Sequence, residues 1–138
     1  MTNWCGLNRS NYFKVKDVEA FKAFVGRCCN LRLVDNENAA DQRYAVINDD
    51  GEGWPDVLYN EDEDGNESET EIDFCAELAK HLDNDVAVLM TAGFEGARYA
   101  SGYALAINCA GETCEVSLTD IYAKALAQFG IQPTAAEY

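Results

Sequence analysis

The chain has 138 residues, 48% of them hydrophobic, with 25 acidic side chains against 10 basic ones and a formal net charge of −15 at neutral pH. This length favours one domain with a substantial core, and the apolar content excludes a disordered chain. The charge excludes binding to a phosphate backbone, which requires Lys and Arg to displace counterions, so the expected partners are basic proteins, basic clefts or cations.

The first part of the chain predicts a strand, a helix and two further strands. Residues 11–15 have strand propensity, and Asp17 then caps an amphipathic helix that is expected to end near residues 29–30. Short apolar runs predict strands at residues 31–34 and 43–47.

The stretch from Asp49 to Asp73 has the most unusual composition. It holds 12 of the 25 acids and contains no Lys or Arg. A proline within residues 54–59 indicates an edge strand, and Asp64-Gly65 is typical of a hairpin tip. Residues 68–74 then return as a strand. Residues 49–73 therefore form a predicted acidic hairpin region.

The second half predicts two more helices, over residues 74–82 with Asp73 as the cap and over residues 118–129 with Gly130 at the end. Strands are expected at residues 86–90, 98–108 and 113–118, with turns at 92–96 and 110–111. A bulge or a close approach is expected at Ser101-Gly102. This order predicts the α+β class: a single domain over residues 1–138 with a mostly antiparallel sheet of several short strands and about three helices.

Most aromatic side chains fall at the spacing of core residues. Those expected in the core are Tyr12, Phe13, Phe21, Phe24, Phe74, Tyr103, Tyr122 and Phe129. Trp54 has two interpretations, because it lies within the acidic stretch: it is an apolar contact for a basic partner, or it closes one end of the core.

The acidic stretch also matches the ligand spacing of an EF-hand calcium loop. Oxygen-bearing residues and a glycine occupy positions 1, 3, 5, 6, 7, 9 and 12, namely Asn60, Asp62, Asp64, Gly65, Asn66, Ser68 and Glu71. Against this hypothesis, position 1 is Asn, position 8 is Glu67, and the preceding WPDV is a poor helix. The alternative function is therefore a structural or regulatory protein-interaction domain that responds to cations through residues 60–71.

The main hypothesis is imitation of nucleic acid. Glu67, Glu69, Glu71 and Asp73 alternate along the predicted strand, so their carboxylates repeat about every 6.6 to 6.8 Å, which is comparable to neighbouring phosphates on one nucleic-acid strand. The competing interpretation is a solvated hairpin that protects a sheet edge. The residues expected to contact a basic partner are Asp49, Asp50, Glu52, Trp54, Asp56, Tyr59, Glu61, Asp62, Glu63, Asp64, Glu67, Glu69 and Glu71.

The sequence contains no catalytic motif, and we expect neither an enzyme nor a cofactor. His81 is the single histidine, without CxxC or HxxxH spacing, and is expected as a surface residue or a favourable charge at a helix end. The six cysteines are expected as reduced thiols. Among them, Cys109 and Cys114 flank a predicted turn and are the pair that could lie close enough to oxidise.

The N-terminus has neither the basic nor the apolar region of a signal peptide. The longest weakly polar run, residues 93–110, is interrupted by charged residues and does not predict a membrane span. These features favour the cytosol of a host cell.

Two stretches, DDGEGWPD and NEDEDGNESETEID, carry a resemblance of charge pattern. Together with the small size and the lack of a catalytic motif, they make the chain similar to the small acidic accessory proteins of phages and plasmids, which include antirestriction and anti-CRISPR proteins that act as DNA mimics. The resemblance implies a non-enzymatic inhibitor that occupies the nucleic-acid-binding surface of a host defence complex.

Overall fold

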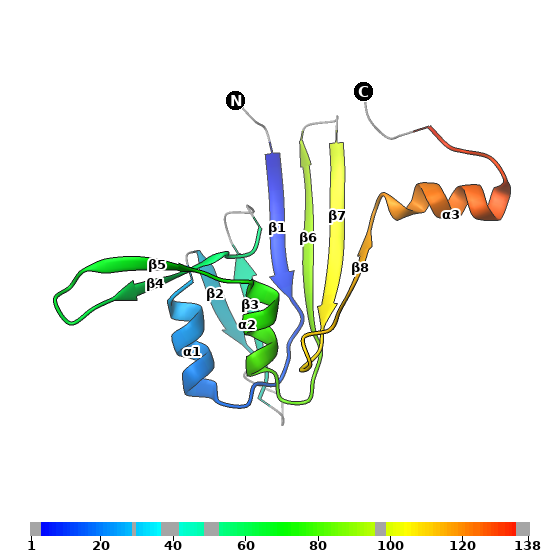
Figure 1. Ribbon diagram of the computed structural model, residues 1–138. Coiled ribbons are helices and arrows are strands. Elements are labelled where there is room, and N and C mark those ends of the chain that lie inside the picture. The colour runs from blue at the N-terminus through cyan, green and yellow to red at the C-terminus, as the bar shows by residue number, and fades with distance from the viewer. Residues whose placement is uncertain (1–3, 29, 37–41, 49–52, 96–98, 135–138) are drawn as a thin grey trace.

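The computed structural model describes residues 4–28, 30–36, 42–48, 53–95 and 99–134 (Figure 1). In chain order the elements are β1 Trp4–Ser10, α1 Val18–Gly26, β2 Leu31–Asp35, β3 Tyr44–Asn48, β4 Val57–Glu61, β5 Glu67–Glu71, α2 Phe74–His81, β6 Ala87–Glu95, β7 Tyr99–Ile107, β8 Thr113–Ser117 and α3 Asp120–Phe129.

Six of the strands form one sheet in the order β2-β3-β1-β6-β7-β8, and every neighbouring pair is antiparallel. The strands β4 and β5 form a separate two-stranded sheet. This arrangement confirms the predicted α+β single domain with an antiparallel sheet. No helix within the described ranges is long and apolar enough to cross a membrane.

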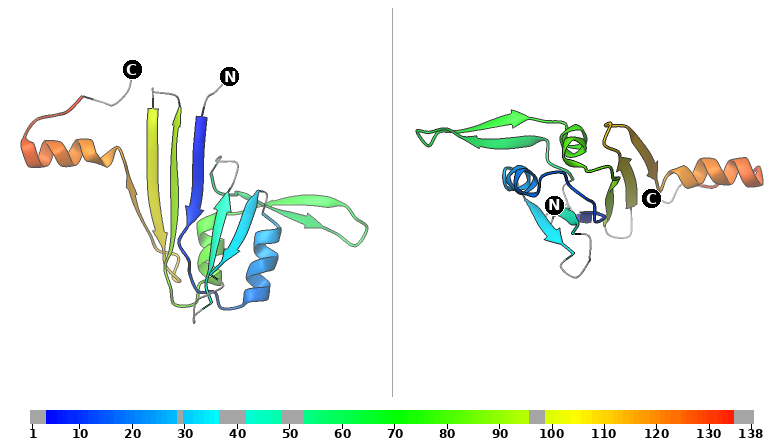
Figure 2. Two further views of the ribbon diagram at one scale, coloured as in Figure 1. Left: turned by 180° about the vertical axis from the view of Figure 1, so that it is seen from behind. Right: turned by 90° about the horizontal axis from the view of Figure 1, so that it is seen from below.

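The helices α1 and α2 cover one face of the six-stranded sheet, which we call the inner face (Figure 2). Alternation along β6 defines the two faces: Ala87 and Leu89 are buried in the core, whereas Met90 is 54% exposed on the opposite, outer face. Completely buried side chains from the helices, the strands and their connections fill the inner side: Phe13, Phe21, Val46, Leu78, Leu82, Leu89 and Ile107.

The helix boundaries follow from local capping. The Asp17 carboxylate accepts the Ala20 N–H at 3.2 Å, and the Asp73 carboxylate accepts the Cys75 N–H at 3.1 Å, so both predicted N-caps are confirmed. Gly130 ends α3 in the left-handed region at φ 72°, as predicted.

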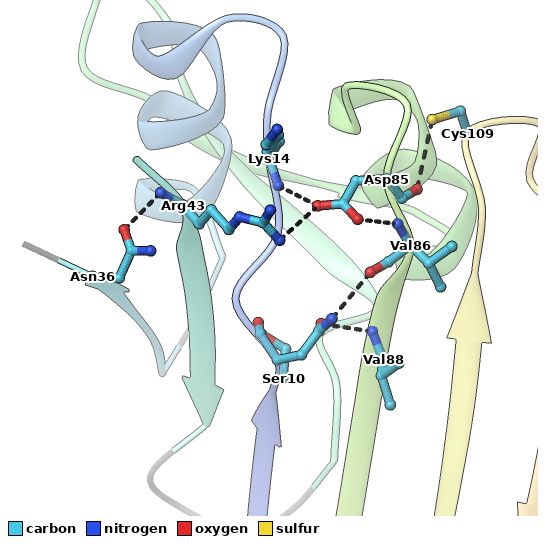
Figure 3. A network of polar contacts seen from close by, with 9 residues as sticks. Ser10, Lys14, Asn36, Arg43, Asp85, Val86, Val88 and Cys109 are labelled. Carbon is cyan, nitrogen blue, oxygen red and sulfur yellow. Dashed lines mark hydrogen bonds and ion pairs between the residues drawn. The ribbon is translucent and has the colours of Figure 1, made fainter. Parts of the chain in front are cut away.

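The Asp85 carboxylate links the beginning of β6 to the N-terminal segment (Figure 3). Asp85 accepts the Lys14 N–H at 2.9 Å and the Val86 N–H at 2.8 Å, and it forms an ion pair with Arg43 at 3.8 Å. Asn11 adds a second link, because its amide donates to the Val86 carbonyl and accepts the Val88 N–H. The bonds made by Lys14 and Asn11 join segments that are more than 70 residues apart in the chain.

The predicted strand at residues 11–15 is wrong. The first strand is β1, and residues 11–15 contribute only isolated bridges at Phe13 and Val15. Sequence alternation missed β1 because its inner face carries the polar Asn8 and Ser10, both buried. Pairing with two neighbouring strands specifies β1, and the segment's own pattern does not.

Two smaller predictions are corrected, and the alternative left open at Ser101-Gly102 is decided. Residues 92–95 continue β6 and do not begin a turn. Gly102 pairs in regular register with Ala92, so β7 has no bulge there, although a close approach at Gly102 is confirmed. The strand expected over residues 68–74 ends at Glu71, because Asp73 caps α2 and Phe74 begins it.

The predicted core aromatics are only partly confirmed. Phe13, Phe21, Phe24 and Phe74 are buried, whereas Tyr12 is exposed. Phe129 is 67% exposed, and no other residue of α3 is buried either. The helix α3 extends away from the sheet in all three views of the molecule (Figures 1 and 2).

Candidate functional site

The acidic stretch folds into the β4–β5 hairpin, which projects from the body of the molecule (Figure 1). Side chains alternate along each strand, so the register assigns them to two faces. One face, which we call the acidic face, consists of Val57, Tyr59, Glu61, Glu67, Glu69 and Glu71. The other face consists of Leu58, Asn60, Ser68 and Thr70.

One buried side chain and three hydrogen bonds attach the hairpin to the body. Leu58 is only 7% exposed and belongs to the hydrophobic core. At the end of α1, the Arg27 carbonyl accepts the Tyr59 N–H at 3.0 Å, and Arg27 Nε donates to the Tyr59 carbonyl at 3.3 Å. Arg27 also donates to the Asn60 side chain, which in turn donates to Thr70 Oγ1 at 2.7 Å. The base of the hairpin is therefore fixed on α1.

On the acidic face, Glu61 lies directly opposite Glu67 in the ladder. Both side chains are exposed, and no Lys or Arg of the described segments forms an ion pair with either of them. Glu69 and Glu71 continue the row along β5, at a spacing of about 6.6 to 6.8 Å for alternate residues. Like charges directly opposite each other destabilise a sheet. The row is thus a series of exposed carboxylates held on regular backbone.

The tip of the hairpin is shaped by one of its own acids. The Asp62 carboxylate accepts the backbone N–H groups of Asp64 at 3.0 Å and Asn66 at 2.8 Å, and also the Asn66 side-chain amide at 3.2 Å. The backbone bond from Asn66 is the main cause that lowers the pKa of the Asp62 carboxyl below its ordinary value. Gly65 adopts the positive φ, 82°, that the turn requires.

Trp54 is placed at the base of the hairpin, at the edge of the core. Its ring stacks on Phe74 with centroids 5.6 Å apart and an interplanar angle of 6°, and Phe74 stacks on Phe24 in turn. Trp54 is half-buried and packs against the core cluster. This placement favours the interpretation that Trp54 closes the core. Tyr59, at 42% exposed, is the aromatic residue presented on the acidic face.

A groove of about 530 Å³ separates the end of α1 from the acidic face. Its lining residues are Gly26, Arg27, Tyr59, Asn60, Glu61 and Glu67. The opposed carboxylates of Glu61 and Glu67 therefore border a space into which a side chain of a partner can enter.

The structure brings together only some of the predicted contact residues. Those on the acidic face are Tyr59, Glu61, Glu67, Glu69 and Glu71, and those at the tip are Asp62, Glu63 and Asp64. Asp56 is exposed at the base of the hairpin, and Asp49, Asp50 and Glu52 lie outside the described residues. Arg27 was missed, because nothing in the sequence near it signals a contact with a strand that begins 30 residues later.

The proposed calcium ligands are not brought together. Asn60 faces away from the acidic face, while Glu71 belongs to it and lies three residue pairs further along the ladder, about 10 Å away. Asp62 is occupied by the hydrogen bonds of the tip. Within the described ranges, no group of three or more His, Cys, Asp or Glu side chains is arranged to hold a metal ion.

His81 is not the surface charge that its position at a helix end predicts. Its ring packs against Phe21 and Phe24, with centroids 5.5 Å and 4.9 Å apart. Burial is the main cause that lowers the pKa of this imidazole below 6.5. His81 therefore packs as a neutral aromatic ring at the edge of the core.

The four cysteines whose side chains are described, Cys28, Cys75, Cys109 and Cys114, are free thiols. Cys109 and Cys114 are not bonded to each other: Cys109 Sγ lies 3.5 Å from the Leu82 carbonyl oxygen, and Cys114 pairs with Ala106 in the ladder. Burial raises the pKa of the Cys28 thiol to about 11. Burial therefore disfavours the reactive thiolate form of Cys28.

Comparison of the chain with protein-family models, with curated proteins and with solved structures finds no match. The functional argument consequently depends on the geometry and charge of the hairpin.

Proposed function

We propose that this protein is a non-enzymatic inhibitor whose acidic face occupies a basic, nucleic-acid-binding surface of another protein. The observation that supports this proposal best is the exposed pair of Glu61 and Glu67, directly opposed at one end of a row of carboxylates. A cation from a partner would relieve the repulsion that this pair experiences in the free protein.

The site is suited to Lys and Arg side chains in particular. A cationic side chain entering the groove between α1 and the hairpin would meet Glu61 and Glu67 together. Glu69 and Glu71 lie further along the same face at a spacing comparable to that of phosphates on a strand. Basic residues that normally contact successive phosphates would therefore find successive carboxylates.

The hairpin also offers an aromatic contact and a rigid base. Tyr59 is half-exposed in the centre of the acidic face, and tyrosine is common among the residues that contribute most to interfaces. The backbone N–H and the carbonyl of Tyr59 are both hydrogen-bonded to Arg27. Because the carboxylates are held on a fixed ladder, binding costs less conformational entropy than it would from a flexible acidic loop.

The net charge of the whole molecule also favours binding to a basic surface. A net charge of −15 attracts a basic surface over long range and repels nucleic acid. We therefore propose competition with DNA or RNA for one protein surface, as in the DNA-mimic inhibitors of restriction or CRISPR complexes that the sequence resembles.

The proposal is tested by capture from a lysate of the cell that carries the gene, at low and high salt. The full chain is the bait, and a triple variant Glu61→Lys, Glu67→Lys and Glu69→Lys is the comparison. The expected result is recovery of a nucleic-acid-binding protein that the variant loses, with affinity at least about 100-fold weaker. Added DNA or RNA should displace the partner.

A matched control separates position from total charge. Glu19→Lys, Asp83→Lys and Glu115→Lys change the net charge by the same amount at exposed sites away from the hairpin. This control should retain the partner. Binding that survives in the hairpin variant, or that both variants lose equally, would contradict a site on the acidic face.

A further inference from the structure

The outer face of the six-stranded sheet presents apolar side chains to solvent. Leu7 of β1, Met90 and Phe94 of β6, and Val116 of β8 are each exposed by about half. Met90, Val116 and Leu118, with small residues between them, border an apolar groove of about 300 Å³. The residues of the outer face that line this groove are Met90, Ala92, Gly102, Ala104, Val116 and Leu118.

The helix α3 is a second uncovered apolar surface. Its large apolar residues Ile121, Leu126 and Phe129 recur at helical spacing and are exposed. Leu118, just before the helix, and Ile131, just after it, are exposed as well. An isolated helix of this length gains little stability in water from backbone propensity alone. An amphipathic helix with no buried residue therefore lacks the packing partner that its sequence is suited to.

The beginning of α3 is fixed on its own sheet. The Leu118 N–H donates to the Gly102 carbonyl at 2.9 Å, and a Cβ added to Gly102 would lie 3.2 Å from Leu118 Cδ1. From this contact the helix runs away from β8, the edge strand (Figures 1 and 2). With its start held there, α3 does not cover the groove of its own chain.

We propose that a second copy of this chain covers these surfaces, with α3 of each copy lying in the outer-face groove of the other. A twofold axis makes the exchange reciprocal, so that both helices and both grooves are covered by one closed interface. The helix supplies large side chains, and the small residues on the sheet allow it to approach closely.

The exposed area is sufficient for a stable dimer. Nine large apolar side chains are involved: Leu7, Met90, Phe94, Val116, Leu118, Ile121, Leu126, Phe129 and Ile131. At roughly 100 Å² of accessible surface each, they expose on the order of 900 Å² per chain, which is close to the ~800 Å² per partner of a standard interface.

The charge distribution permits self-association at this end of the molecule. The helix α3 carries one acid and one base, Asp120 and Lys124, in a chain with a net charge of −15. The acidic hairpin projects from the opposite side (Figure 1). Two copies that meet through α3 and the outer face therefore keep their acidic hairpins apart and available.

The first test is sedimentation equilibrium of the full chain over a range of concentrations and salt. We expect a dimer that persists or tightens in high salt, because screening weakens the repulsion between two acidic chains while apolar contacts remain. A monomer at all concentrations would overturn the proposal. This outcome does not depend on the acidic face, whose binding should weaken with salt.

Variants locate the interface. Ile121→Glu with Phe129→Glu on the helix, and separately Met90→Glu on the sheet, should each raise the dimer dissociation constant by about 100-fold or more. Lys124→Glu on α3 is the matched control and should leave it within a few-fold. Circular dichroism should remain unchanged, since all these side chains are exposed. A dimer that withstands either the helix pair or the sheet variant would overturn the reciprocal arrangement.

Discussion

Arg27 and Tyr59 bind each other in both directions: the Tyr59 N–H donates to the Arg27 carbonyl at 3.0 Å, and Arg27 Nε donates to the Tyr59 carbonyl at 3.3 Å. This reciprocal pair joins the end of α1 to the middle of β4, on the edge of the strand that β5 does not occupy. It determines the orientation of the acidic face relative to the rest of the molecule.

Replacing Arg27 should therefore loosen the hairpin selectively. Arg27→Ala removes the side-chain bonds to Tyr59 and Asn60, at a cost of about 1 to 2 kcal/mol, because both are hydrogen bonds from a charged donor near the surface. Amide hydrogen exchange should accelerate in β4 and β5 more than in β6 or β7. Lys22→Ala, at an exposed position of α1, is the control and should leave the hairpin protected. Uniform acceleration across the sheet would contradict a local role.

The opposed pair of Glu61 and Glu67 predicts opposite effects on stability and binding. Glu67→Lys converts a repulsive cross-strand pair into an attractive one, so the free energy of unfolding should rise by up to about 1 kcal/mol. Affinity for a basic partner should fall. Glu69→Lys, opposite Tyr59, should weaken binding without a comparable gain in stability, as measured by urea unfolding. Destabilisation by Glu67→Lys would show that the repulsion is already relieved in the free protein.

His81 should make the protein less stable in mild acid. Its folded pKa is below the ordinary value of 6.5, because burial against Phe21 and Phe24 disfavours the charged ring. The unfolded chain therefore binds the proton more readily, and the stability present above pH 6.5 is lost as pH falls through the folded pKa. His81→Phe retains an aromatic ring and should lessen the fall in melting temperature below pH 6.5. Parallel curves for the two proteins would contradict a role for this imidazole.

Thiol modification should distinguish buried from exposed cysteines. Cys109 and Cys114 are exposed, whereas Cys28 is buried and its pKa is raised to about 11. A shift of this size from the ordinary 9.0 lowers the thiolate fraction by about 100-fold, and burial further restricts access. Site-resolved mass spectrometry after brief alkylation should find Cys114 modified and Cys28 intact, with Cys28 reacting only in denaturant. Equal labelling of both sites in the folded protein would contradict the buried position.

The sequence by itself determined the features that arise from interactions between near neighbours. Asp17 and Asp73 cap the helices that directly follow them, Gly130 ends α3, and Asp64-Gly65 forms the turn between β4 and β5. Each depends on a side chain or a backbone conformation within a few residues, so local chemistry is sufficient. The alternation of acids along β5 was also readable, because strand periodicity alone assigns them to one face.

Only the tertiary structure decided which of these parts meet. The central position of β1 depends on pairing with β3 and β6, because its own polar inner residues conceal the strand pattern. Glu61 became the partner of Glu67 through the ladder register, and Arg27 reached Tyr59 across more than 30 residues. Periodicity predicted an apolar stripe on α3, but the presence or absence of a covering surface depends on chain topology. Contacts between distant segments are set by the packing of the whole domain, which no local pattern in the sequence encodes.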